Sequence, residues 1–65
     1  MSLKLSSSHV FQIGDRVYDL EYGDYGSVTL VKSPEQVMVL FDHVCQINNK
    51  RLELPVDTYH LLQVN

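Results

Sequence analysis

The stretch GDRVYDLEYGDYGSVTLV, residues 14–31, places two alternating runs on either side of a turn. The first run, 14–20, predicts a strand whose apolar and polar side chains point to opposite faces. Residues 21–26 predict the turn, since glycine adopts positive φ without steric cost and aspartate suits turn positions. The second run, 27–31, alternates again, so the whole stretch predicts a β-hairpin. The inward residues are then Val17, Val28 and Leu30, and the outward ones Arg16, Tyr18, Ser27, Thr29 and Val31.

The rest of the chain continues this period of two, and no segment shows helical periodicity. The further predicted elements are a hairpin loop at 32–35, strands at 36–42 and 51–55, a turn at Asn48-Asn49, one 3₁₀ turn within 56–60 and a last strand at 61–64. The predicted fold is all-β, with five short antiparallel strands in a small barrel or sandwich. The predicted core is Val17, Val28, Leu30, Val37, Val39, Phe41, Leu52, Leu54, Leu62 and Val64.

Composition limits the classes of protein to consider. Sixty-five residues make one domain, expected over 10–65, with a frayed serine-rich segment at 1–9. The net charge of −3 is concentrated in residues 15–24, which hold four acids and one base, while the rest of the chain is balanced. This distribution argues against non-specific binding of nucleic acid, which depends on lysine and arginine.

The setting is expected to be the cytoplasm, without a membrane. Cys45 is the single cysteine, so no internal disulfide is available. The longest apolar run, 37–41, is far too short to span a bilayer, and the first residues lack the apolar stretch of a signal peptide.

Three groups of residues together resemble a known fold family. Residues 14–31, then VMVLFD (37–42) and KRLELPVDTYHLLQV (50–64), resemble an SH3-like barrel of the Tudor/KOW type. The pattern is similar to the C-terminal Tudor-like domain of UvrD-type helicases and the KOW domain of NusG-like factors. The matching positions are Gly14, Asp15 and Val17, then Gly26 and Val28, then Leu54, Pro55 and the strand at 61–64. The resemblance implies a binding module that docks on a nucleic-acid-processing protein, although the first loop here is acidic rather than basic.

The tyrosines of the first turn have two interpretations. Tudor-like barrels can carry an aromatic cage for a methylated lysine or arginine in this region, so the resemblance implies a cage of Tyr18, Tyr22 and Tyr25, with Asp24 or Asp42 adding charge complementarity. The alternative, which we favour, is a structural corner whose rings cover one end of the barrel and whose hydroxyls stay in water. In that case the main role of the turn is structural, and binding a partner is its secondary role.

The outward face of the third strand is unexpectedly apolar. Met38 and Leu40 would point outward beside Val31 and Tyr18, as a partner surface or a homodimer seam. Alternatively, the strongly bent strands of a barrel bury both faces in places, or the segment with Val10, Phe11 and Ile13 folds over this strand.

Residues for other chemistry are sparse. His43 and Cys45 are two apart, but a metal site needs three or four ligands, so neither metal nor cofactor is expected, and Cys45 is interpreted as a small buried side chain. No nucleophile motif or phosphate loop is present, and an enzyme is not expected. The basic residues that could form a weak phosphate-binding patch are Arg16, Lys32, Lys50 and Arg51.

The sequence therefore predicts a non-enzymatic module for protein–protein interaction, accessory to a transcription or DNA-repair machine and suited to a small bacterial or phage protein. The predicted protein-binding residues are Tyr18, Tyr22, Tyr25, Met38 and Leu40. The alternatives are weak nucleic-acid binding through the four basic residues with a stacking tyrosine, and a reader of methyl-lysine type.

Overall fold

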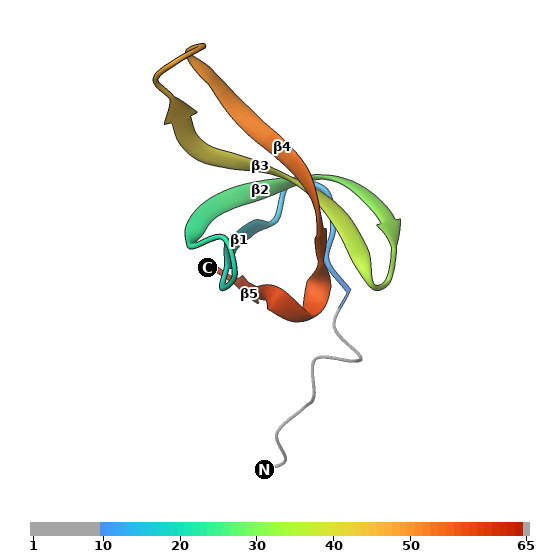
Figure 1. Ribbon diagram of the computed structural model, residues 1–65. Helices are drawn as coiled ribbons and strands as arrows, with labels where there is room; N and C mark the ends of the chain where they lie inside the picture. The colour runs from blue at the N-terminus through green and yellow to red at the C-terminus, as the bar shows by residue number, and fades with distance from the viewer. Residues whose placement is uncertain (1–9, 65) are drawn as a thin grey trace.

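Five antiparallel strands form one curved sheet in the computed structural model, which describes residues 10–64 (Figure 1). The elements are β1 (Arg16–Asp19), β2 (Asp24–Ser33), β3 (Gln36–Cys45), β4 (Lys50–Asp57), the 3₁₀ helix η2 (Thr58–His60) and β5 (Leu61–Gln63). The spatial order is β4-β3-β2-β1-β5. The predicted fold class, all-β with a 3₁₀ turn before the last strand, is confirmed, whereas the predicted frayed segment 1–9 lies outside the described residues.

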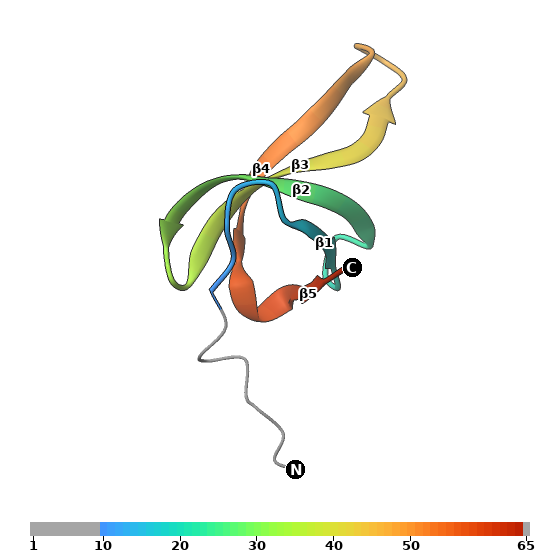
Figure 2. The same cartoon turned by 180° about the vertical axis from the view of Figure 1, so that it is seen from behind.

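The two edges of the sheet are β4 and β5, and η2 connects them along the chain. Among residues 10–64 no strand ladder joins β4 to β5. The segment before β1 adds to the sheet at another place: the Gly14 amide donates to the Val28 carbonyl at 2.8 Å, and the Val28 amide donates to the Asp15 carbonyl at 3.0 Å. Figure 2 shows this segment, in blue, passing across the curved sheet before it enters β1.

The core lies on the inner face of the sheet, and its centre was predicted correctly. Val17, Val28, Val37, Val39 and Phe41 are fully buried, as the alternation of their strands requires. Leu54 is half-buried and packs against this cluster, and Val64 is half-buried. The core also contains three residues that the sequence did not indicate: Phe11, Val56 and Leu61.

Three predicted core residues are wrong, since Leu30, Leu52 and Leu62 are 49%, 43% and 53% exposed. A β-bulge between Val28 and Leu30 inserts an extra residue in β2, which turns Leu30 to the outer face opposite Met38. Leu62 points outward because the strand after η2 begins with the buried residue Leu61.

Leu52 is exposed because it lies on a projecting arm. Between Leu40 and Val44 the pairing of β3 with β4 shifts register, and beyond this bulge the two strands leave the body of the protein (Figure 1). The arm ends in a turn in which Asn49 has a φ of 57°, as the Asn48-Asn49 prediction requires. Cys45, predicted to be buried, is only half-buried here.

β4 extends further than predicted, through Pro55 to Asp57. Pro55 is tolerated because β4 is an edge strand, where a missing N–H costs no ladder hydrogen bond. This extension brings Val56 into the core and carries Asp57 to the start of η2.

Candidate binding site

The turn between β1 and β2 is fixed by one buried carboxylate. The Asp19 side chain is only 3% exposed, and its Oδ1 accepts hydrogen bonds from the backbone amides of Glu21 at 2.8 Å and Tyr22 at 3.2 Å. The Asp19 carbonyl accepts from the Gly23 amide at 2.7 Å, where Gly23 has a φ of 80°. These contacts place the Tyr22 ring on Phe41, with ring centroids 4.4 Å apart.

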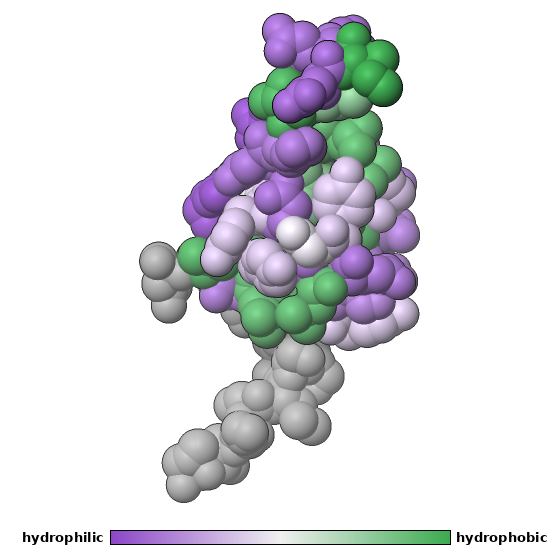
Figure 3. All heavy atoms as spheres, turned by 60° about the vertical axis from the view of Figure 1, so that its left-hand side comes forward, coloured by the Kyte–Doolittle hydropathy of each residue, from purple (hydrophilic) through white to green (hydrophobic). Residues whose placement is uncertain are grey.

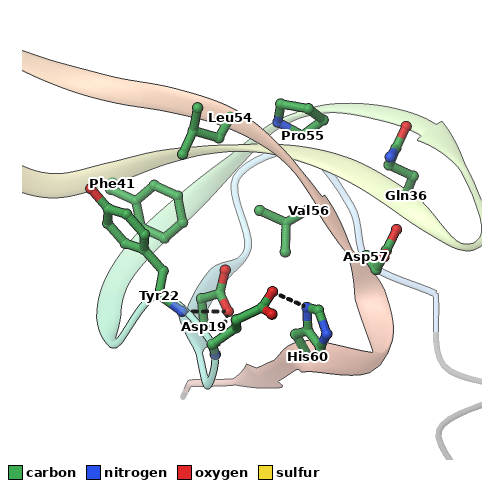
Figure 4. Close-up of a pocket in the computed structure, with 10 residues that line it drawn as sticks. Asp19, Tyr22, Gln36, Phe41, Leu54, Pro55, Val56, Asp57 and His60 are labelled. Carbon is green, nitrogen blue, oxygen red and sulfur yellow. Dashed lines mark hydrogen bonds and ion pairs between the residues drawn. The ribbon is translucent and has the colours of Figure 1, made fainter.

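A cavity of about 390 Å³ lies between this turn and β4 (Figure 4). β4 contributes an apolar wall, the turn and β3 contribute the aromatic pair, and η2 contributes an imidazole. The lining residues are Asp19, Glu21, Tyr22, Gln36, Phe41, Leu54, Pro55, Val56, Asp57 and His60.

The walls of the cavity are acidic. Three carboxylates line it, from Asp19, Glu21 and Asp57, while no lysine or arginine is among the lining residues in the described chain. Among the described lining residues His60 is the one basic group, and its Nδ1 lies 3.3 Å from Oε1 of Glu21. The Asp57 side chain makes no capping hydrogen bond to η2. The cavity therefore combines apolar surface with acceptors that are not all engaged.

The three tyrosines of the predicted cage do not converge. Tyr18 and Tyr25 face each other across the β1–β2 ladder on the outer face, with ring centroids 4.8 Å apart, whereas Tyr22 lines the cavity. The acid proposed for the cage at position 24 is also engaged: Asp24 accepts from the amides of Tyr25 at 2.8 Å and His43 at 3.0 Å. The second candidate acid, Asp42, binds two arginines.

Met38 and Leu40 lie on the outer face of β3, as predicted, and both are half-buried. Met38 lies between its ladder partners Leu30 and Pro55, which makes an apolar strip across three strands. Of the segment expected to cover this face as an alternative, Phe11 belongs to the core, while Val10 and Ile13 are exposed. The predicted protein-binding residues thus divide between two faces, with Tyr22 on the cavity side and the other four outside.

A further exposed apolar group lies at the end of the projecting arm. Ile47 is 95% exposed in its turn, and Val44 is exposed on the adjoining strand. Figure 3 shows hydrophobic atoms (green) at the end of this arm, next to hydrophilic ones (purple).

The base of the arm is held by an ion-pair cluster around Asp42. Arg16 donates two hydrogen bonds to its carboxylate, from Nη1 to Oδ1 at 2.9 Å and from Nη2 to Oδ2 at 2.6 Å. Arg51 approaches the same carboxylate at 3.3 Å, and its Nε donates to the carbonyl of Phe41 at 2.9 Å. The hydrogen bonds that Arg16 donates to Asp42 lower the pKa of the Asp42 carboxyl and raise the pKa of the Arg16 guanidinium.

The four basic residues therefore do not form one patch. Arg16 and Arg51 are paired with Asp42. Lys32 lies next to the β2–β3 turn and Lys50 pairs with Cys45 in the arm, so the two lysines are at opposite ends of the ten-residue β3. A phosphate backbone would meet two separated lysines rather than a continuous basic surface.

Replacing Asp42 with asparagine is expected to lower the melting temperature by a few degrees at neutral pH, because both arginines lose their partner. The lowered pKa means that the carboxylate stabilises the fold fully above about pH 5 and progressively less as the pH falls through its folded pKa. Thermal unfolding of both proteins from pH 7 to pH 2 should therefore show a difference that shrinks below about pH 4. A difference that stays constant down to pH 2 would contradict the role of the ion pair.

The described residues offer neither a metal site nor a membrane-spanning helix. His43 is exposed, and within residues 10–64 no group of three or more His, Cys, Asp or Glu side chains could hold a metal ion. In the same part of the chain, no helix has the length and apolar character needed to cross a membrane.

Comparison of the chain with protein-family models, with curated proteins and with solved structures finds no match. The Tudor/KOW-type relationship thus stays a prediction from the quoted residues, and the site has to be interpreted from its own geometry.

Sequence reasoning missed Asp19, Asp57 and His60 as neighbours in one cavity. One local signal was available: an aspartate two or three residues before the amides of a glycine-containing turn is typical of an Asx turn, so a structural role for Asp19 could have been inferred. No local signal links Asp57 or His60 to that turn, because these residues are distant in the sequence and only the folded chain brings them to the same cavity.

Proposed function

We propose that the protein is a non-enzymatic protein-binding module and that the cavity beside Tyr22 receives part of its partner. The observation that supports this most is the cavity itself, whose volume of about 390 Å³ lies within the usual range of ligand-binding pockets, about 300–1,000 Å³. Its frame is rigid: the turn is fixed by three hydrogen bonds to Asp19, and the opposite wall is a strand.

Tyr22 is the anchor that this proposal assigns to the contact. It is exposed in part, packs on the buried ring of Phe41 and stands at the edge of the cavity. Aromatic side chains with one packed and one accessible face contribute strongly to protein interfaces. A partner in a transcription or DNA-repair machine is a part of the proposal that rests on the family resemblance, and the cytoplasmic setting is a part that rests on composition and hydropathy.

The Tyr22→Ala variant is expected to lose a partner that the wild-type domain retains, with at least a tenfold drop in recovered partner, because truncated hot-spot aromatics cost about 2 kcal/mol or more. The measurement is a pull-down from source-cell lysate with nuclease, at low and high salt, quantified by mass spectrometry. Tyr25→Ala is the matched control, since it removes the same ring from the outer face.

Two results would contradict the proposal. Equal loss in both variants, or loss only in Tyr25→Ala, would move the contact to the outer face with Met38 and Leu40. Retention of nucleic acid alone, lost as the salt concentration rises, would favour the nucleic-acid alternative through Lys32 and Lys50. Circular dichroism of each variant checks that it is folded.

A further inference from the structure

We propose that the cavity binds a primary ammonium group, presented by a lysine side chain of the protein partner. This inference rests on the proposed function and names the chemistry of its ligand. It is carried by an unengaged oxygen of a buried carboxylate that points into the cavity.

Asp19 uses only one of its two carboxylate oxygens. Oδ1 accepts from the amides of Glu21 and Tyr22, whereas Oδ2 accepts no hydrogen bond within residues 10–64. Figure 4 shows this second oxygen directed away from the turn, toward the space below Leu54 and Val56. Asp19 is almost completely buried, with 3% of its surface exposed. A buried carboxylate oxygen without a donor is costly, so the site favours a ligand that brings one.

The other acceptors favour a cation. Asp57 lines the same cavity, and its carboxylate has no hydrogen bond or ion pair in the described chain. Glu21 is the third acid and is already engaged with His60. Within residues 10–64 no lysine or arginine lines the cavity, so the three carboxylates make the potential between its walls negative.

The geometry distinguishes a lysine from the other cations of proteins. Arginine binds carboxylates best through two parallel hydrogen bonds, which need both oxygens of one carboxylate, and at Asp19 one oxygen is occupied. An ammonium group is a compact charge with three separate donors, so it can donate to Asp19 Oδ2 alone while the remaining donors face the other acceptors of the cavity.

A methylated lysine fits less well for two reasons. A trimethylammonium group has no N–H and would leave Asp19 Oδ2 without a donor. The aromatic surface is also too small for a cage, because Phe41 is buried and stacked on Tyr22, and the Tyr18–Tyr25 pair lies on the other face. Tyr22 supplies one ring for the aliphatic stem and for a single cation–π contact.

The test uses Nα-acetyl-lysine methylamide as the probe, titrated into the ¹⁵N-labelled protein at constant ionic strength. We expect saturable chemical-shift changes at the amides of Asp19, Tyr22, Val56 and Asp57. The neutral Nε-acetylated probe should cause no such changes, and the Nε-trimethylated probe should bind roughly tenfold more weakly because it makes no hydrogen bond.

Three variants make the test specific. Asp57→Asn removes one cavity charge without breaking a hydrogen bond of the fold and should weaken binding several-fold. Asp19→Asn keeps an oxygen for the turn but replaces the free acceptor, and should weaken binding by roughly tenfold. Glu35→Gln is the control, since it removes an exposed charge that does not line the cavity and should leave binding unchanged.

Equal binding of the trimethylated probe, or equal weakening by Glu35→Gln, would overturn the proposal. Saturation by free spermidine at a lower concentration than by the lysine probe would assign the cavity to a free polyamine and overturn the lysine assignment. The outcome is separable from the proposed function: a partner lost in Tyr22→Ala but kept in Asp57→Asn and Asp19→Asn supports a protein-binding module and refutes the ammonium site.

Discussion

The Gly26→Ala variant is expected to lose about 3 kcal/mol or more of its free energy of unfolding, at the upper end of the cost of overpacking. A Cβ at this position would lie 2.6 Å from Cγ1 of Val39, 2.8 Å from the carbonyl oxygen of Leu40 and 3.2 Å from Cα of Phe41. Two of these three atoms are backbone atoms of the neighbouring strand, so they cannot move aside without separating β2 from β3. A domain of this length has about 3–10 kcal/mol in total, so much of the stability would be lost.

Gly23→Ala is the matched control for this variant. Its Cβ would meet nothing within 4 Å, and only the φ of 80° opposes the change. We expect a loss of about 1 kcal/mol from that strain. Urea unfolding, followed by circular dichroism, measures the free energy of unfolding of both variants. Equal losses in the two variants would contradict this account, because the close contacts of a Cβ at position 26 would then cost no more than the backbone strain at position 23.

The Phe41→Ala variant is expected to lose about 3–5 kcal/mol, the usual cost of deleting a buried phenylalanine ring. Phe41 is the largest of the fully buried side chains, and its ring also supports Tyr22. The truncation therefore removes the core contact and the floor under the proposed contact surface together. In a domain with a thin core, little neighbouring mass is available to fill the space.

Tyr59→Ala provides the comparison for this second variant, because it deletes an aromatic ring that is mostly exposed and touches His60 at a centroid distance of 4.3 Å. Its expected cost is less than about 1 kcal/mol. Differential scanning calorimetry of both variants gives the two values under one condition. If Phe41→Ala cost no more than Tyr59→Ala, the core would not be centred on β3.

Strand identity was readable in the sequence because a half-buried strand imposes a period of two on its side chains. Val37, Val39 and Phe41 alternate without interruption, and each is buried as predicted. The errors occur where a backbone irregularity changes the phase of the alternation. The bulge after Val28 exposes Leu30, and η2 shifts the inward position from Leu62 to Leu61. Such irregularities depend on pairing with other strands, so the local sequence does not specify them.

The candidate site was only partly predictable for a related reason. Tyr22 was identified because tyrosine next to glycine in a turn is a recognisable local feature. Asp57 and His60 join it because β4 continues through Pro55 and η2 then turns the chain back. A proline in a run normally indicates that a strand ends, and only the edge position of β4 permits the exception. The acidic character of residues 15–24 was visible in the sequence, whereas only the fold shows that Asp19 and Glu21 of this segment line a cavity together with Asp57.

The pairing of β1 with β5 has a consequence for the order of events in folding. β2, β3 and β4 form successive hairpins from neighbouring parts of the chain. The pairing of Val17 in β1 with Gln63 in β5 instead joins residues that are far apart in the sequence. The loop that this contact closes spans almost the entire domain, so its entropic cost falls on a late step. We therefore expect the hairpins of β2–β4 to form early, and the docking of β5 on β1 to complete the cooperative transition. On a ribosome, that final step would begin only after residues 61–63 have left the exit tunnel.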